Sequence, residues 1–189
     1  MQTNHPIVMK QRDKRLLVWC FSTLLSLGAI AFQSEAFAER LDASWVHGNS
    51  IHLEQPTAMS INYFGFGGML TLPAANRFTL GGWVHFALPT PTLEDGVRSK
   101  LNQILISHEG TATIDSIDVW DGPNKIASQQ VLVTGDHVNL NSLTVVDLPS
   151  NPLIFWGVTI SIHVVNNCGA ATCPQQYMRF VAAGGDFLN

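Results

Sequence analysis

The stretch that most clearly indicates the fold is residues 155–165, which read Phe-Trp-Gly-Val-Thr-Ile-Ser-Ile-His-Val-Val. Apolar side chains alternate here with small or polar ones, and the apolar set comprises Trp156, Val158, Ile160, Ile162 and Val164. A period of two residues is typical of a β-strand with one buried and one polar face. We therefore expect this strand, Trp156 included, to pack its apolar set against a hydrophobic core.

Residues 81–88 repeat the alternation, with Val84, Phe86 and Leu88 on one face and Trp83, His85 and Ala87 on the other. Further short segments rich in β-forming residues occur at residues 44–46, 51–54, 59–64, 69–72, 103–108, 114–120, 126–133, 143–148 and 177–182. No amphipathic helix of three turns can be drawn after residue 38. Many short strands separated by turn residues predict a single-domain antiparallel β-sandwich of jelly-roll-like form.

The N-terminal segment has the order of charges typical of an export signal. Four basic residues lie within the first fifteen positions, an uncharged and largely apolar run follows at residues 16–32, and Ala36 and Ala38 close the segment. This pattern predicts a signal peptide at residues 1–38, cleaved before Glu39, and a secreted or periplasmic domain at residues 39–189. The alternative is a retained membrane anchor, because the apolar run approaches the ~20 residues that span a bilayer.

Charge limits the partners of the predicted domain. Residues 39–189 hold six Lys and Arg residues against twelve Asp and Glu residues, a formal net charge of −6. Nucleic acid attracts basic surfaces, so the sequence predicts no nucleic-acid partner. No second apolar stretch is long enough for a transmembrane helix, so we expect no stable membrane insertion after cleavage. The oligomeric state stays open.

The predicted domain has two cysteines, Cys168 and Cys173. An even number of cysteines in a secreted chain predicts a disulfide bond. A bridge between them would close a loop of six residues and act locally. The alternatives are a redox pair or half of a metal site. The spacing is not Cys-x-x-Cys, and the predicted domain has no further cysteine to complete a zinc site.

The sequence contains none of the usual catalytic nucleophile, phosphate-loop or zinc-helix motifs, so we assign no catalytic residue, metal or cofactor. One interpretation of Asp115, Asp118 and Asp121 is a calcium or acid–base cluster. Side chains alternate along a strand, so Asp115 and Asp118 would point to opposite faces unless a bulge intervenes. We expect solvated strand-edge and turn residues instead.

Two pairs of an aromatic residue and a histidine are the strongest candidates for a ligand-binding surface. Trp45 and His47 are two positions apart, as are Trp83 and His85, so each pair would share one face of a strand. An exposed tryptophan often marks a binding site. The alternative for Trp83 is that residues 92–100, which we expect to form a surface loop, fold over it and bury it. For the other histidines of the predicted domain, the default interpretation is a structural or solvated side chain.

The motifs Ala-Ser-Trp-Val-His-Gly-Asn at residues 43–49 and Trp-Val-His-Phe-Ala-Leu-Pro-Thr-Pro at residues 83–91 occur with two others. These are the Asp-Gly-Pro segment at residues 119–126 and Ala-Gly-Gly-Asp-Phe at residues 183–187. Together they resemble a family of small, mostly bacterial all-β proteins classed as a domain of unknown function. The resemblance implies a compact β domain, and it supplies no activity, cofactor or catalytic residue.

The leading hypothesis is therefore a non-catalytic binding or interaction module outside the cytoplasm. One alternative is a hydrolase or metal-dependent enzyme that uses His and Asp residues distant in sequence. A second alternative is a structural subunit of a surface assembly.

Overall fold

The computed structural model describes residues 41–55, 59–94 and 96–188, which belong to one compact unit, Glu39–Asn189. The predicted signal peptide lies outside the described residues. All strand pairings within the described part are antiparallel. Its only helical element is a 3-10 turn, η1 (Gly48–Ser50). The chain is thus an all-β protein, as its alternating pattern predicted.

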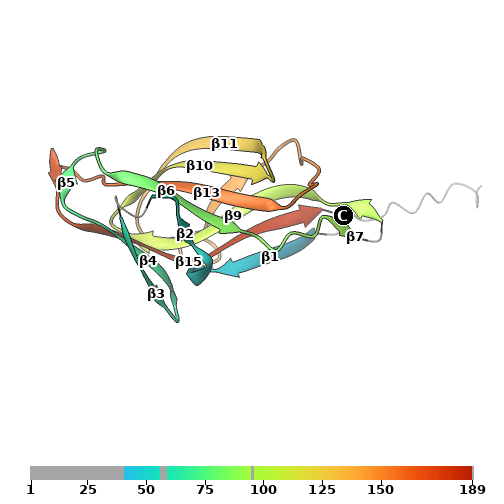
Figure 1. The fold of residues 1–189 in the computed structure, drawn as a ribbon, viewed down its shortest axis with the longest axis horizontal. Helices are drawn as coiled ribbons and strands as arrows, with labels where there is room; N and C mark the ends of the chain where they lie inside the picture. The colour runs from blue at the N-terminus through green and yellow to red at the C-terminus, as the bar shows by residue number, and fades with distance from the viewer. Residues whose placement is uncertain (1–40, 56–58, 95, 189) are drawn as a thin grey trace, which may run out of the picture. The chain divides into compact units, whose positions relative to one another are not determined.

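Most strands belong to two sheets (Figure 1). The six-stranded sheet contains, in spatial order, β12 (Thr144–Asp147), β9 (Lys100–Gly110), β15 (Gln176–Leu188), β4 (Gly67–Leu72) and β3 (Ser60–Phe64). Its sixth strand, β1 (Leu41–His47), pairs with the second half of β15. The five-stranded sheet contains β11 (Asn124–Val133), β10 (Thr113–Asp121), β13 (Val158–Val165), β6 (Gly81–Ala87) and β2 (His52–Leu53).

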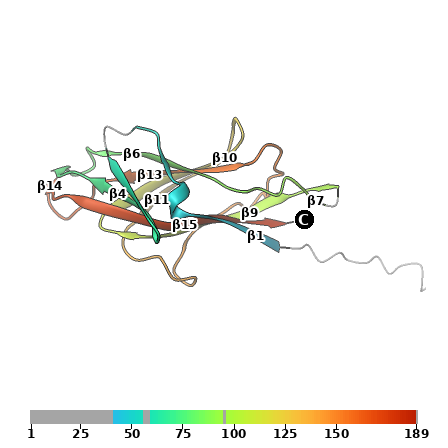
Figure 2. The same cartoon turned by 60° about the horizontal axis from the view of Figure 1, so that its bottom comes forward.

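The two sheets pack face to face as a β-sandwich. Figure 2 shows β6, β13 and β10 on one side and β15, β9 and β1 on the other. The chain crosses repeatedly between the layers: β6 belongs to one sheet, β9 to the other, and β10 to the first again. The prolines at 89 and 91 lie in the first of these crossings, outside any strand. This arrangement agrees with the predicted jelly-roll-like sandwich.

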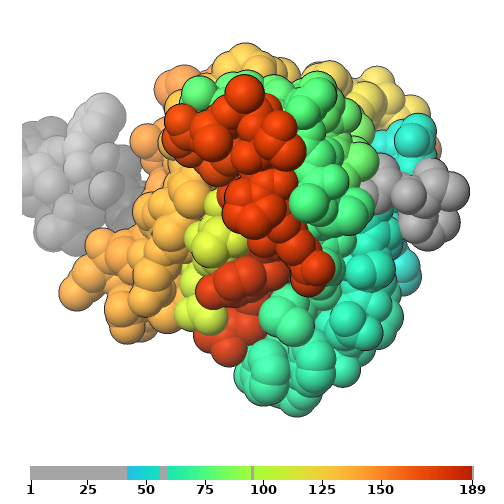
Figure 3. Space-filling view, turned by 90° about the vertical axis from the view of Figure 1, so that its left-hand side faces the viewer, coloured from blue at the N-terminus to red at the C-terminus, as the bar shows by residue number. Residues whose placement is uncertain are grey.

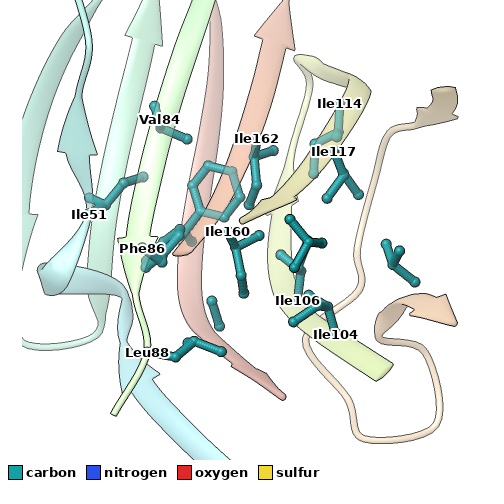
Figure 4. Packing of buried hydrophobic residues seen from close by; sticks show 14 of the residues in the cluster. Ile51, Val84, Phe86, Leu88, Ile104, Ile106, Ile114, Ile117, Ile160 and Ile162 are labelled. Atoms are coloured by element: carbon teal, nitrogen blue, oxygen red, sulfur yellow. The ribbon is translucent and has the colours of Figure 1, made fainter. Parts of the chain in front are cut away.

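The core lies between the sheets and follows the predicted alternation. Val84 and Phe86 of β6 are fully buried, as are Ile160 and Ile162 of β13 (Figure 4). The ring of Phe86 meets that of Phe180, which comes from the opposite sheet, at a centroid distance of 5.6 Å in an edge-to-face geometry. Burial of these side chains is the main stabilising contribution, at about 1.5–3 kcal/mol for each large aliphatic or aromatic residue.

One residue of the predicted core lies outside it. The side chain of Trp156 is 73% exposed, because β13 begins at Val158 and residues 155–157 form a loop. The carboxylate of Asp121 accepts hydrogen bonds from the backbone N–H groups of Phe155, Trp156 and Gly157, at 2.9, 2.7 and 3.0 Å. This contact with the end of β10 replaces the strand pairing that the alternation predicted.

Two other segments differ from the expected lengths. The last predicted strand, residues 177–182, extends to Leu188 as β15, so the Ala-Gly-Gly-Asp-Phe motif is strand. Residues 92–100, expected as a loop, contain a small hairpin of β7 (Leu93–Glu94) and β8 (Val97–Arg98). The period of two is not visible in the second half of β15, because the glycines there carry no side chain.

Cys168 and Cys173 form a disulfide, with their α-carbons 5.6 Å apart, which confirms the predicted bridge. The bridge closes the connection between β13 and β14 (Thr172–Cys173), and β14 pairs with β5 (Ala75–Asn76). Figure 3 views this end of the molecule, where the orange-red segment containing the bridge lies across green chain. The bridge therefore fastens one end of the sandwich and does not cross-link the two sheets.

In the part of the chain that the structure describes, no helix has both the length and the apolar character needed to cross a lipid bilayer.

Candidate functional site

The outer face of the five-stranded sheet carries aromatic and polar side chains. Residues opposite each other in an antiparallel pair share a face, and β13 lies between β6 and β10. On β13, Thr159, Ser161 and His163 lie opposite Ala87, His85 and Trp83 of β6, respectively. The same three residues of β13 lie opposite Trp120, Asp118 and Ser116 of β10. We call this surface the tryptophan face, after Trp83 and Trp120.

The tryptophan face is hollowed into a depression of about 580 Å³. Its lining comes from four strands of the sheet and two connecting segments, and consists of Glu54, Trp83, His85, Asp118, Trp120, Gly122, Lys125, Thr159 and Ser161. Two indole rings thus share one surface with two separate carboxylates, an imidazole, an ammonium group and two hydroxyls. Such a mixture of apolar rings and a few polar groups is characteristic of ligand sites.

A chain of polar contacts crosses the middle of the tryptophan face. The Nδ1 atom of His85 lies 2.8 Å from Oγ of Ser161, and its Nε2 atom lies 3.6 Å from a carboxylate oxygen of Glu54. Ser161 is buried, whereas His85 is half-buried. These contacts fix the orientation of the imidazole ring.

The second polar group is centred on Asp118. Its Oδ1 atom accepts a 2.6 Å hydrogen bond from Oγ of Ser128, and its Oδ2 atom lies 2.7 Å from Nζ of Lys125. The ammonium group of Lys125 also lies 5.1 Å from the ring centre of Trp120. Lys125 is therefore held between a carboxylate and an aromatic ring.

Trp83 is supported from the side by His163. The two ring centres are 4.9 Å apart with the planes tilted by 46°. The Nδ1 atom of His163 lies 2.7 Å from Oδ1 of Asp115. A register shift in β10 between Ile114 and Ser116 places Asp115 at a bulge, so Asp115 and Asp118 both reach the outer face. The alternation of a regular strand would have separated them.

The structure divides the four predicted ligand-binding residues between opposite sides of the sandwich. Trp83 and His85 lie on the tryptophan face. Trp45 and His47 belong to β1 and lie on the outer face of the six-stranded sheet, where the ring of Trp45 covers Gly184. A β-carbon at Gly184 would come within 2.6 Å of that ring. In the alternative interpretation, residues 92–100 cover Trp83. No described residue of this segment, which contains the hairpin of β7 and β8, lines the depression beside Trp83.

The three aspartates have separate partners, and Asp118 and Asp121 are buried, not solvated as the sequence predicted. Asp115 contacts His163, Asp118 contacts Lys125, and Asp121 binds the backbone of residues 155–157. Among the described residues, no group of three or more His, Cys, Asp or Glu side chains is arranged to hold a metal ion. A second hollow, of about 450 Å³ between β11 and β12, has Asp147 as its single titratable lining residue.

His108 and His137 form a stacked pair away from the tryptophan face. Their ring centres are 4.8 Å apart, and Nε2 of His108 lies 2.8 Å from Oγ1 of Thr144. Burial and then the neighbouring charge of His137 lower the pKa of His108 to about 4, although the charge of Asp136 acts in the opposite direction. The pair fastens the loop after β11 to β9, through a backbone hydrogen bond of 2.8 Å between the same residues.

Sequence reasoning missed Trp120 and Trp156 as surface residues. Trp120 ends one segment rich in β-forming residues and Trp156 lies near the start of another, so the pattern predicts strand for both. A signal for Trp120 was available: it is two positions from Asp118 and alternates with the apolar Ile117 and Val119. No comparable local signal exists for Trp156, because its exposure depends on the distant Asp121.

The sequence model of a family of unknown function, DUF6623, matches residues 40–187. The chain belongs to this family. The match spans the whole sandwich, including both tryptophan–histidine pairs and the disulfide. No curated protein matches the chain. Membership of DUF6623 therefore confirms the resemblance to a domain of unknown function and leaves its activity open.

Several solved structures align with this chain at low similarity. TmCBM61 in complex with β-1,4-galactotriose aligns at a TM-score of 0.41 and 13% identity, covering 77% of this chain and 88% of that one. CBM27-1 of Caldicellulosiruptor saccharolyticus, in complex with mannohexaose, aligns at 0.36 and 11%, covering 75% and 96%. A family 11 carbohydrate-binding module of Clostridium thermocellum aligns at 0.32 and 10%, covering 78% and 89%. Likenesses this low assign no ligand to the DUF6623 chain.

Proposed function

We propose that this chain is an exported, non-catalytic binding module that holds a carbohydrate chain on its tryptophan face. The observation that carries this proposal is the depression in which the indole rings of Trp83 and Trp120 share one surface with fixed polar groups. The disulfide between Cys168 and Cys173 supports a location outside the reducing cytoplasm.

The chemistry of the depression matches the two kinds of surface on a sugar ring. A pyranose has an apolar face of C–H bonds and a rim of hydroxyl groups. Flat indole rings offer apolar area to the first, and Glu54, His85 and Asp118 offer hydrogen-bonding atoms to the second. These polar side chains are already oriented by Ser161, Ser128 and Lys125, so little conformational entropy is lost when a ligand binds.

The charges of the tryptophan face favour an uncharged ligand. Glu54, Asp115 and Asp118 are acidic, whereas Lys125 is the one lysine or arginine among the lining residues. Lys125 is paired with Asp118 at 2.7 Å, so it leaves no excess positive charge. An acidic polysaccharide or a phosphate-bearing ligand would be repelled at this surface.

A second candidate function follows from the row Ser161, His85 and Glu54. A serine hydroxyl, an imidazole and a carboxylate in contact have the order of a hydrolase triad. Ser161, however, lies inside the central strand β13, whose backbone N–H groups point along the sheet toward its neighbours on both sides. No pair of free backbone donors is thereby offered to an oxyanion, so binding accounts better for the geometry.

Binding of uncharged polysaccharides tests the proposed function. We expect a glycan array or affinity electrophoresis to detect a neutral polysaccharide bound by the purified protein. Replacing Trp83 with Ala should weaken this binding about tenfold or more, equivalent to about 1.4 kcal/mol, because an apolar platform is lost. Trp45→Ala is the matched control, since Trp45 lies on the other side of the sandwich.

Thermal unfolding shows whether either variant is merely unfolded. Equal loss of binding in the Trp45→Ala and Trp83→Ala proteins, at unchanged stability, would contradict a site on the tryptophan face. Covalent labelling of the wild-type protein by a fluorophosphonate, abolished by Ser161→Ala, would instead favour the hydrolase.

A further inference from the structure

Trp156 is held in a fixed, exposed position at one end of the tryptophan face. Its backbone N–H and those of its two neighbours donate to the carboxylate of Asp121, which is itself only 3% exposed. The carbonyl oxygen of Gly157 also accepts a 3.1 Å hydrogen bond from the N–H of Gly122. A buried carboxylate that accepts three hydrogen bonds restrains this loop strongly. The large exposed ring is thus presented by an ordered loop.

Gly122 connects Trp156 to the depression. Gly122 belongs to the depression's lining, together with Trp120 and Lys125. A β-carbon at Gly122 would lie 2.7 Å from Cβ and 2.8 Å from Cγ of Trp156, so the tryptophan side chain rests directly on this glycine. The exposed surface of Trp156 therefore continues the tryptophan face beyond Trp120.

The three tryptophans are spread along the direction of β13. Trp83 is level with His163, and Trp120 is level with Thr159, while Trp156 lies two positions before the strand begins. At about 3.3 Å per residue, the step along β13 from Trp83 to Trp120 is about 13 Å. Trp156 lies in the loop before β13, further on in the same direction, where it contacts Gly122. Trp83 comes from β6 and Trp120 from β10, so the series crosses the sheet obliquely.

We propose that Trp156 is a third stacking platform, and that the ligand is an unbranched, uncharged oligosaccharide chain lying from Trp83 past Trp120 to Trp156. This inference rests on the proposed function of the tryptophan face. A path that covers the step of about 13 Å from Trp83 to Trp120 and continues to Trp156 takes several linked sugar rings in extended form. A mono- or disaccharide would reach only one of the three rings. Recognition is therefore of a stretch of polymer, with affinity that depends on chain length.

A length series of neutral oligosaccharides tests this inference. The probes are β-1,4- and β-1,3-linked gluco-oligosaccharides and β-1,4-linked xylo-oligosaccharides of two to six units, titrated calorimetrically into the purified protein. In the series that binds, affinity should rise by about tenfold or more between two and five units and then level off. Replacing Trp156 with Ala should lower the affinity for the hexamer about tenfold and leave that for the dimer within about twofold.

Phe155→Ala is the matched control. Phe155 is the adjacent exposed aromatic residue, but its ring lies under the guanidinium of Arg98, 4.9 Å away, whereas the atoms nearest to Gly122 belong to Trp156. This variant should bind the hexamer as the wild-type protein does.

The outcomes separate this inference from the proposed function. Equal affinity for all chain lengths, or a hexamer affinity that falls with Trp83→Ala and not with Trp156→Ala, would overturn the inference and leave the binding function intact. An equal loss in the Phe155→Ala protein would also overturn it, because the whole loop rather than the Trp156 ring would then be responsible. If the wild-type protein binds a neutral polysaccharide on the array but no linear oligosaccharide of that polysaccharide in solution, the inference is wrong and the binding function stands. If it binds no neutral polysaccharide at all, both proposals are wrong.

Discussion

Asp118 and Asp121 are three positions apart on one strand and have different hydrogen-bond partners. Asp118 faces the tryptophan face and contacts Lys125 and Ser128. Asp121 ends the same strand and is buried. Its two carboxylate oxygens accept the backbone hydrogen bonds that residues 155–157 would otherwise donate to a neighbouring strand. Residue type alone does not distinguish these roles, because the partners of each carboxylate come from other segments.

Asp121→Asn should lower the free energy of unfolding by about 2 kcal/mol, because hydrogen bonds to a charged acceptor contribute about 1.5–3 kcal/mol. An amide can still accept from Trp156 and Gly157, but its NH2 group would then face the N–H of Phe155. Urea unfolding measures the change, and Asp147→Asn on the exposed side of β12 is the control. A variant as stable as the wild-type protein would show that the carboxylate does not hold the loop.

His108 makes stability depend on pH. Its pKa in the folded protein is about 4, below the ordinary histidine value of 6.5, so the folded state binds fewer protons than the unfolded state in this range. The stabilisation is therefore complete above pH 6.5 and is lost as the pH falls toward 4.

From pH 7 to pH 5, protonation of the unfolded histidine should cost the folded state about 2 kcal/mol. Urea unfolding at the two pH values measures this loss. His108→Gln should remove it, whereas His52→Gln, at an exposed position of β2, should retain it. A pH dependence that is the same in the His108→Gln and wild-type proteins would contradict the assignment.

At the level of elements, the period of two predicted β6 and the body of β13 correctly. Both strands are buried on one face and polar on the other, which is the condition under which alternation is visible in a sequence. It failed at Trp156, where a tertiary hydrogen bond ends the strand. The alternation also gives no signal for the second half of β15, where glycines at 184 and 185 lie close to Trp45 and to core leucines. The bulge in β10 that brings Asp115 to the outer face leaves no sequence signal.

The disulfide should stabilise its own connection and little else. Replacing both Cys168 and Cys173 with Ser should lower the free energy of unfolding by about 2 kcal/mol, the chain-entropy value for a closed loop of this size. The far-UV circular dichroism should stay nearly unchanged, because neither main sheet is cross-linked by the bridge. Loss of the β signal in the double variant would contradict a local role.

At the scale of the molecule, the tryptophan face exists only once the sandwich has formed. Most of its residues come from β6, β10 and β13, which neighbour each other in space but not in sequence, because β9 and β12 of the opposite sheet lie between them in the chain. The sequence could therefore identify Trp83 and His85 as candidate surface residues. It could not show that Trp120 joins them, or that Trp45 lies on the other side, because strand order is fixed by long-range pairing.

Export is the prediction that concerns the whole chain. Mass spectrometry of protein recovered from the periplasm or medium should find an N-terminus at Glu39, because Ala36 and Ala38 suit the specificity of signal peptidase. An N-terminus that retains the residues before Leu16 would show a membrane-anchored precursor instead.

The position of β15 has a consequence for when the protein can fold. This strand lies inside the six-stranded sheet and pairs with β9, β4 and β1, all of which precede it in the chain. The earlier strands therefore lack their common neighbour until residues 176–188 have been synthesised, and such distant pairing is slow to form. A nascent chain with this topology therefore stays unfolded for longer, and the predicted export through a translocation pore requires an unfolded chain.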